Sequence, residues 1–426
     1  MFGSKDLGNW GKEMNELGTA HNPDLDDLLS DEAINRPFDY YRRLREIHPV
    51  LWNPRWNGWI VTSYDAVIAG YRDSERLSSD RFSGPFGAEM RTSETKYAQL
   101  IGFLARFFVW KDAPYHTRMR MLVNKTFTPK SVEMLRPRIR ALVQDLGAPL
   151  RGREDVDFMS EFAFTLPVVV IAEFLGIPSE ARFDVRDWSN DIGGVVFMGG
   201  DDDRRFVKGE QAMANLVDFL RPIIRERMRS PKDDLISRLC HAEDSGTRLD
   251  EDDIIANTVL MVFAGHETTM NLLASGMIAF DRFPDQWQRL RQDPSLAKSA
   301  TEEVLRYDGP IKGLGRWAKV PFDFHGRQIK QGDRVLLMQH AANHDPAAFD
   351  NPDDFDIGRW PNRHAAFGQG IHTCLGAPLA RLEAQEAFSW LATNFGRVEV
   401  LNKEPRYVRT LVARAVDDLH VRFHDA

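Results

Sequence analysis

The sequence predicts a mainly α-helical fold with small β-sheets, of the α+β class. Two long segments, 250–280 and 377–391, carry the helical signal: the first contains no proline, and the only proline of the second lies in its first turn, where it is tolerated. The strand signal consists of short runs of β-branched and aromatic residues that turn residues separate. These runs lie at 50–52, 59–62, 322–335, 398–400 and 419–423.

The composition excludes several classes of function. Lysine and arginine number 55 against 63 aspartates and glutamates, and the net charge of −8 argues against nucleic acid as the main partner. Two cysteines are too few for a disulfide scaffold and favour a reducing, cytoplasmic compartment. Residues 1–22 predict a polar, partly disordered leader with no apolar run long enough for a signal peptide or membrane anchor.

The first quarter of the chain predicts short helices beside a small sheet. Residues 35–48 form an amphipathic helix, and residues 63–74 form a second helix with Ser63 at its N-cap. The segment 78–108 is irregular and rich in phenylalanine, which fits a loop anchored in the core. A further helix is expected at 111–124.

Glycines divide the helical segment 181–228. Gly193-Gly194 and the run 199–203 interrupt it, so we expect two helices with flexible joints, as in a lid that opens and closes over an active site. The apolar residues 195–198 lie beside these joints and either touch a substrate or belong to the core.

The segment 250–280 predicts a central buried helix with an unusual middle. Asp250 is placed to cap it, and apolar residues lie on most of its faces, as expected for a helix surrounded by protein. Its middle nevertheless contains Gly265, Glu267 and Thr268, and an unpaired buried carboxylate is costly. This group marks either a functional site or a kink at which the threonine bonds to its own backbone.

The run 367–376 contains one of the two cysteines and three glycines. Glycine lacks the Cβ that blocks close approach to the backbone, so the run predicts a tight loop that a large ligand can approach. Cys374 lies just before the helix at 377–391, whose dipole favours a thiolate, and a thiolate there is a metal ligand or a nucleophile. A lone cysteine also fits a small buried hydrophobic residue. His372 has no neighbouring carboxylate to orient it as a base and Cys240 offers no paired spacing for zinc, so haem iron, whose other ligands are already present, suits a single thiolate.

The pattern Phe-Gly-x-Gly-x-His-x-Cys-x-Gly at 367–376 resembles the haem-binding loop of the cytochrome P450 superfamily, in its soluble bacterial form. Three further stretches resemble family motifs in the same order. They are His116-x-x-x-Arg120, the run 264–268, and Glu303-x-x-Arg306 with Arg359 as the third member of a buried cluster. Taken alone, His116 and Arg120 would also fit an exposed polar helix face. The resemblance implies a single domain over 23–426, with haem b between the long central helix and the cysteine loop.

The resemblance also implies roles for individual residues. Cys374 would be the axial thiolate, while Glu267 would relay protons and Thr268 would steady the bound oxygen. Lys312 would reach solvent, a haem propionate or, alternatively, an anionic group of the substrate. The residues expected to bind or border the haem are His116, Arg120, Gly265, Arg316, Phe367, Gly368 and His372.

The function that the resemblance implies is monooxygenation. One oxygen atom from O2 would enter a small hydrophobic organic substrate, by hydroxylation or oxidative dealkylation, and the other would become water. Electrons would come from NAD(P)H through a ferredoxin and a ferredoxin reductase, because the chain has no glycine-rich nucleotide motif and no cysteine set for an iron–sulfur cluster. Two alternatives stay open: a haem-thiolate enzyme driven by hydrogen peroxide, and a non-catalytic haem-binding sensor or electron carrier.

The chain is expected to act as a monomer, with the segment 78–108 over its substrate pocket. A group of basic residues follows His116 in the sequence, and it fits an acidic ferredoxin and ordinary solvated charge equally well. These residues are Lys125, Lys130, Arg136, Arg138 and Arg140.

Overall fold

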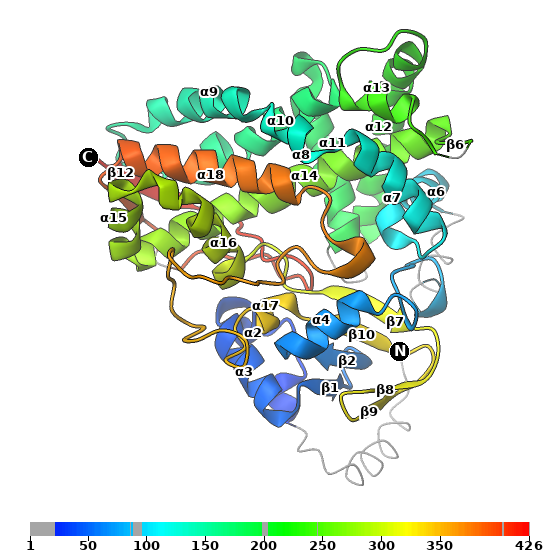
Figure 1. Cartoon of the computed structure of the whole chain (residues 1–426), viewed down its shortest axis with the longest axis horizontal. Helices are drawn as coiled ribbons and strands as arrows, with labels where there is room; N and C mark the ends of the chain where they lie inside the picture. The colour runs from blue at the N-terminus through cyan, green and yellow to red at the C-terminus, as the bar shows by residue number, and fades with distance from the viewer. Residues whose placement is uncertain are drawn as a thin grey trace.

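The chain folds into a helical region and a smaller region that contains the main sheet (Figure 1). The structure, a computed structural model, describes residues 22–425 except 86, 88–95, 198–202, 245 and 403. The leader predicted at 1–22 lies outside the described residues except for Asn22, as do Met198 and all but the last residue of the joint predicted at 199–203.

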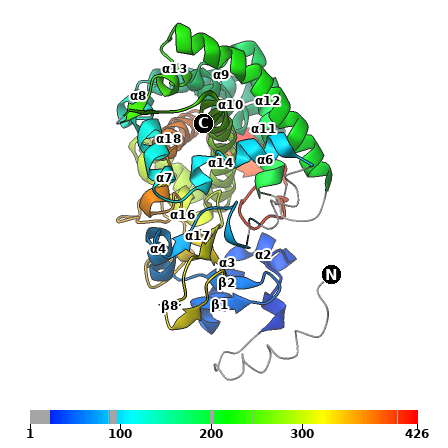
Figure 2. The ribbon, with the colours of Figure 1, turned by 90° about the vertical axis from the view of Figure 1, so that its right-hand side faces the viewer.

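The main sheet has five strands in the order β1 (Val50–Asn53), β2 (Gly58–Val61), β10 (Arg334–Leu337), β7 (Leu314–Ala318) and β3 (Leu77–Ser78). Strand β10 pairs in parallel with β2 and antiparallel with β7, which places Val335 opposite Arg316. In both views the helices α2 (Asp31–Asn35), α3 (Pro37–Ile47), α4 (Tyr64–Arg72) and α17 (Gln339–Ala342) lie around this sheet (Figure 2). The strands and the helix predicted here from residues 35–62 are confirmed.

The long helix α14 (Glu251–Arg282) runs through the centre of the helical region. The Asp250 side chain caps it by accepting the N–H of Asp253 at 2.6 Å, as predicted. The helices packed against α14 include α10 (Thr165–Leu175), α11 (Arg182–Phe197), α12 (Asp203–Arg229), α16 (Ala297–Asp308) and α18 (Ala377–Asn394).

The remaining elements surround this framework. The helices are α6 (Ala98–Leu104), α7 (Tyr115–Thr126), α8 (Pro129–Glu133), α9 (Arg136–Gly147), α13 (Leu235–Cys240) and α15 (Pro284–Gln292). The smaller sheets comprise β4 (Val156–Asp157) with β11 (Arg397–Val400) and β12 (His420–His424), β5 (Glu243–Asp244) with β6 (Thr247–Arg248), and β8 (Phe322–Phe324) with β9 (Arg327–Ile329).

Three local predictions are wrong because tertiary contacts replace the expected local ones. Ser63 occupies the N-cap of α4 without a side-chain bond, and Asp345 Oδ2 accepts the Tyr64 N–H at 2.8 Å instead. The helix predicted from residue 111 starts at Tyr115, since the Asp112 carboxylate binds Ser78 and Ser79 in and after β3. Gly193-Gly194 lies inside α11 and is not a joint between helices.

Candidate active site

Cys374 opens into a mainly apolar cavity of about 250 Å³ between the cysteine loop (residues 367–376) and α14. The loop contributes Phe367, Gly368 and His372 to the wall as well, and α14 contributes Ala264 and Thr268. Ser79, Arg81 and Phe107 of the segment 78–108, which was predicted to roof a pocket, line the same space, as do Val109 and Trp110 directly after it. The fold therefore brings the cysteine loop, the central helix and the aromatic segment together around one cavity.

The backbone of the cysteine loop leaves space for a flat ligand. Gly370 has φ 73°, and a Cβ there would stand 2.6 Å from the Tyr71 carbonyl oxygen, so only glycine fits. Gly368 has φ 65°, and a Cβ there would meet no atom within 4 Å. The Cys374 N–H donates to the Phe367 carbonyl at 2.9 Å, which closes the loop.

The Cys374 thiol is exposed to the cavity, although protein surrounds it on its other sides. Burial raises its pKa, while the backbone N–H groups of Gly376 and Ala377 and the cation Arg120 oppose this rise. The start of the helix therefore favours the thiolate, as expected from the sequence, while burial acts in the opposite direction. A metal cation at the sulfur would supply the missing stabilisation, because a coordinating thiol is deprotonated.

Two histidines beside the cavity lack hydrogen-bond partners. The rings of His116 and His372 lie 3.9 Å apart between centroids, and both nitrogens of His116 and Nε2 of His372 are buried without a partner. Burial, with the nearby charge of Arg120, lowers the pKa of His116 to about 4, so its imidazole is neutral at pH 7. Buried polar groups are nearly always paired, so these nitrogens indicate a site that a polar ligand completes.

Arginine side chains extend the same group. Arg316 is buried on β7 and lines the cavity; among the described residues its guanidinium donates only to the Gly315 carbonyl, at 2.8 Å, and pairs with no carboxylate. Arg120 Nη2 donates to the Thr373 carbonyl at 2.7 Å and ties α7 to the cysteine loop. Cations and neutral imidazoles at one end of an apolar cavity, with a thiol beside them, fit the two carboxylates and the iron of haem.

Arg81 is a wall residue that the motifs do not predict. Its side chain lines the cavity with the guanidinium carbon 4.9 Å from the centre of the Trp110 ring. The one sequence signal was an arginine within the aromatic segment 78–108, and such a signal does not say which way a loop residue points.

On α14, Thr268 lines the cavity and Glu267 does not. The Thr268 hydroxyl donates to the Ala264 carbonyl at 2.9 Å, so the backbone bond considered as an alternative does form. The Glu267 carboxyl lies toward α11, where a Cβ on Gly193 would stand 3.0 Å from its Oε2. Burial raises the pKa of Glu267 to about 7.

Gly265 does not border the cavity, contrary to prediction. A Cβ at this position would stand 3.2 Å from Cγ1 of Ile171 on α10, so the glycine allows two helices to pack closely. Ala264, one residue earlier, is the small side chain that faces the cavity.

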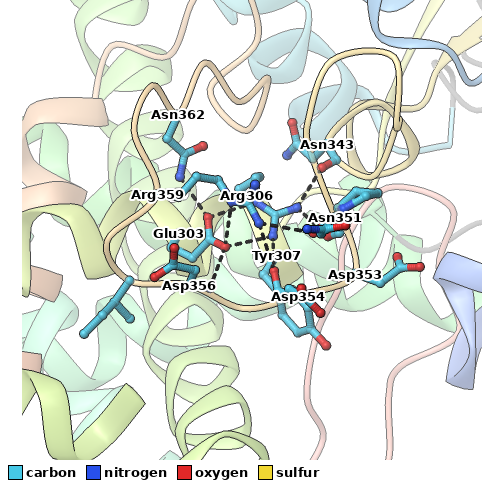
Figure 3. Close-up of polar contacts among 12 residues, drawn as sticks. Glu303, Arg306, Tyr307, Asn343, Asn351, Asp353, Asp354, Asp356, Arg359 and Asn362 are labelled. Carbon is cyan, nitrogen blue, oxygen red and sulfur yellow. Dashed lines mark hydrogen bonds and ion pairs between the residues drawn. The ribbon is translucent and has the colours of Figure 1, made fainter. Parts of the chain in front are cut away.

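The buried cluster predicted beneath the loop is confirmed (Figure 3). Glu303 accepts Nη2 of Arg306 at 2.8 Å and Nε of Arg359 at 3.1 Å, and the Asn362 amide donates to it at 2.9 Å. The other donors of Arg306 bind the carbonyls of Asn343, Pro352 and Asp354, so its charge is fully paired.

A second carboxylate, Glu302, connects the same helix to the loop. It accepts Nε and Nη2 of Arg381 at 2.7 and 2.8 Å and Nε2 of His364 at 3.0 Å. Arg381 in turn lies over the Phe367 ring at 4.4 Å. Although burial alone would raise the pKa of Glu302, these partners lower it to about 2.

Lys312 is buried, with 3% of its surface exposed, so the expectation that its amine reaches solvent is wrong. Its backbone N–H donates to the Val412 carbonyl at 2.7 Å, and it is not among the residues that line the cavity. Burial and the neighbouring charge of Arg414 lower the pKa of the Lys312 amine to about 7.

The basic group that follows His116 is partly neutralised. Arg138 pairs with Glu173 at 2.6 Å, and Arg136 and Arg140 share Glu386 at 2.5 and 2.9 Å.

Elsewhere in the described part of the chain, no group of three or more His, Cys, Asp or Glu side chains is arranged to hold a metal ion. None of the described helices has the length and apolar character to cross a bilayer.

Comparison with known proteins agrees with this geometry. The family model described as Cytochrome P450 matches residues 195–410. The Bacillus subtilis protein named Polyketide biosynthesis cytochrome P450 PksS is 36% identical over 379 residues, which are 87% of this chain and 91% of that protein. Cytochrome P450 107B1 of Saccharopolyspora erythraea is 37% identical over 421 residues, 95% of this chain and 99% of the relative.

A solved structure supports the fold over almost the whole chain. The structure of P450BioI in complex with hexadec-9Z-enoic acid ligated acyl carrier protein superimposes with a TM-score of 0.85 at 32% identity, covering 92% of this chain and 100% of that one. The predicted mainly helical fold with small sheets is therefore confirmed. With both the family model and long relatives in agreement, the chain belongs to the cytochrome P450 family and is a cytochrome P450 monooxygenase.

Proposed function

We propose that this monooxygenase binds haem b in the cavity beside Cys374 and inserts one atom of O2 into a hydrophobic organic substrate. The observation that carries the proposal is a cavity with a single thiol and unpartnered basic side chains at its wall. Haem, when bound, supplies the activation of dioxygen with electrons delivered from outside the chain.

The chain's own residues would hold the cofactor by charge and hydrogen bonds. Cys374 would provide the axial thiolate, and the N–H groups of Arg316, His116 and His372 would donate hydrogen bonds to the propionates. Arg120 would act mainly on the loop, because its guanidinium is already bound to the Thr373 carbonyl. Phe367 and Gly368 would border the ring of the cofactor.

Thr268 and Glu267 would manage protons. The Thr268 hydroxyl donates its hydrogen bond to the Ala264 carbonyl. Its oxygen can therefore accept a hydrogen bond from a water or a bound ligand in the cavity. A carboxyl group with a pKa of about 7 is half protonated near neutral pH, which suits a group that takes up and releases protons. Glu267 would have to turn from α11 toward the cavity to serve Thr268.

The substrate is proposed to be hydrophobic because the cavity wall is mainly apolar, and the names of two similar proteins suggest an aliphatic chain. The relative PksS is named for polyketide biosynthesis, and P450BioI was solved with a fatty acyl carrier protein. Fatty acyl and polyketide chains are therefore the first substrates to test, before aromatics and terpenes.

The electrons are proposed to come from NAD(P)H through a ferredoxin and its reductase. Near the cysteine the chain exposes Ile371, which is 37% accessible, and α7 exposes Met121, which is 42% accessible. Apolar side chains on the outer side of a redox centre fit the docking of such a partner. Monomeric state and cytoplasmic location stay predictions.

The test of the proposal is the absorbance of the reduced, haem-loaded protein under carbon monoxide. We expect the far-shifted Soret band of a thiolate-ligated haem, its loss in Cys374→Ser and its retention in the control Cys240→Ser, since Cys240 donates only to the Ile224 carbonyl far from the cavity. An unchanged band in Cys374→Ser would contradict the proposal. Turnover with ferredoxin, reductase and NADPH, compared with hydrogen peroxide alone, separates the monooxygenase from the peroxide-driven alternative.

A further inference from the structure

Arg81 lies on the cavity wall without an anionic partner among the described residues. Its guanidinium packs against Trp110, which also lines the cavity, with 4.9 Å between the guanidinium carbon and the ring centre. Two aspartates of the neighbouring segments are engaged elsewhere. Asp80 Oδ1 accepts the Phe82 N–H at 2.8 Å, and both oxygens of Asp112 bind Ser78 and Ser79.

A charged guanidinium in this position lacks an anion to balance its charge. Removing a cation from bulk water is costly unless an anion or several acceptors replace the water. Burial, together with the neighbouring Arg316, lowers the pKa of Arg81 to about 10, which still leaves it charged at pH 7. Two guanidiniums on one wall repel each other. An anion between or beside them would reduce this repulsion and would also offset the cost of removing the cations from water.

Arg81 comes from a different part of the chain than the residues proposed to hold the haem. Arg81 belongs to the segment 78–108, whereas Arg316 lies on β7 and His116 and Arg120 lie on α7. Arg81 therefore lies on the cavity wall over the Trp110 ring, within reach of the charge of Arg316.

From this position we infer that Arg81 binds a carboxylate at the cavity wall, and that the carboxylate belongs to the substrate. A planar guanidinium matches a carboxylate with two parallel hydrogen bonds, and the Trp110 ring holds its plane. An apolar cavity with one such cation selects an amphipathic acid, with its chain in the cavity and its head group on Arg81. This inference rests on the proposed haem-dependent function, because the haem reports the binding.

The test compares dodecanoic acid with dodecanol, which share the chain and differ in the head group. Each is titrated into the haem-loaded protein, and binding is followed by the shift in haem spin state. We expect Arg81→Gln to weaken binding of the acid by about tenfold or more, as for loss of a charge-assisted hydrogen-bond pair, and to leave the alcohol unchanged. Arg81→Lys should retain part of the preference.

Lys111→Gln is the matched control. It also removes one positive charge, from a side chain 5.4 Å from the Phe82 ring in the same region, but Lys111 does not line the cavity. We expect this variant to bind both compounds as the wild type does.

A second measurement distinguishes the substrate from the cofactor as the source of the carboxylate. If Arg81→Gln leaves acid binding intact but speeds the transfer of haem to apomyoglobin, the carboxylate is a haem propionate and the assignment to substrate is overturned. If neither quantity changes, or if the wild type prefers the alcohol, the carboxylate site itself is overturned. Failure of the proposed function would look different, since the wild type would then give no thiolate-type Soret band.

Discussion

Two groups of buried charge lie near the cysteine loop, and they differ in whether they are paired. Around Glu303 every charge has a partner: two arginines and an amide bind the carboxylate, and backbone carbonyls take the remaining donors. At the cavity wall, Arg81 and Arg316 pair with no carboxylate among the described residues. Paired charges hold the loop in place, whereas unpaired cations mark where a ligand must supply the opposite charge.

The largest expected effect is on the paired group. Glu303→Gln would leave Arg306 and Arg359 buried without a counter-charge, so we expect the free energy of unfolding to fall by about 3–5 kcal/mol. Denaturant unfolding measures this change. Glu133→Gln is the control: Glu133 is an exposed partner of Arg136, whose other partner Glu386 remains, and no measurable loss is expected. A loss below about 1 kcal/mol in Glu303→Gln would contradict the comparison.

The pairing of Glu302 predicts a pH dependence. Its pKa is about 2 in the folded protein against 4.5 for an ordinary glutamate, so the unfolded chain binds the proton more readily. The stabilisation is complete above about pH 4.5 and is lost as the pH falls toward 2, with a total of about 3 kcal/mol. Unfolding of the wild type and of Glu302→Gln across this range measures it, and equal slopes for the two proteins would refute the prediction.

Removal of a charge from the unpaired group should change the free energy of unfolding in the opposite direction. In the haem-free protein, Arg316→Met removes a buried cation that no carboxylate balances, so we expect the free energy of unfolding to rise by about 1 kcal/mol. The same variant should lose haem faster once the cofactor is bound, because a propionate would then lack its partner. A haem-free variant less stable than the wild type would show that Arg316 is balanced within the chain.

The smallest effect is expected from two neighbouring glycines of α11. Gly193→Ala would crowd the Glu267 carboxyl at 3.0 Å, whereas a Cβ on Gly194 meets no atom within 4 Å. We expect Gly193→Ala to lower the product formed per NADPH consumed about threefold, by misplacing a proton donor, and Gly194→Ala to change nothing. In a Glu267→Gln background the Gly193→Ala effect should vanish; if it persists, the glycine acts through the helix and not through Glu267.

The sequence by itself determined the framework of this protein. Local rules of helix formation, turn formation and residue spacing account for three features. These are the proline-free run that became α14, the glycines that a tight loop requires and the order of the motifs. These rules predict which residues stand on one helix face or in one turn, and so they predicted the Cys374 loop. The Glu303 cluster was expected from the resemblance to the cytochrome P450 superfamily.

Only the tertiary structure decided which neighbours each side chain meets. It turned Gly265 toward Ile171 and Glu267 toward Gly193, replaced the Ser63 cap by Asp345, and brought Arg81 to the cavity wall. The physical reason is that pairing and burial depend on segments far apart in the chain, and no local pattern records whether a buried charge will find its partner.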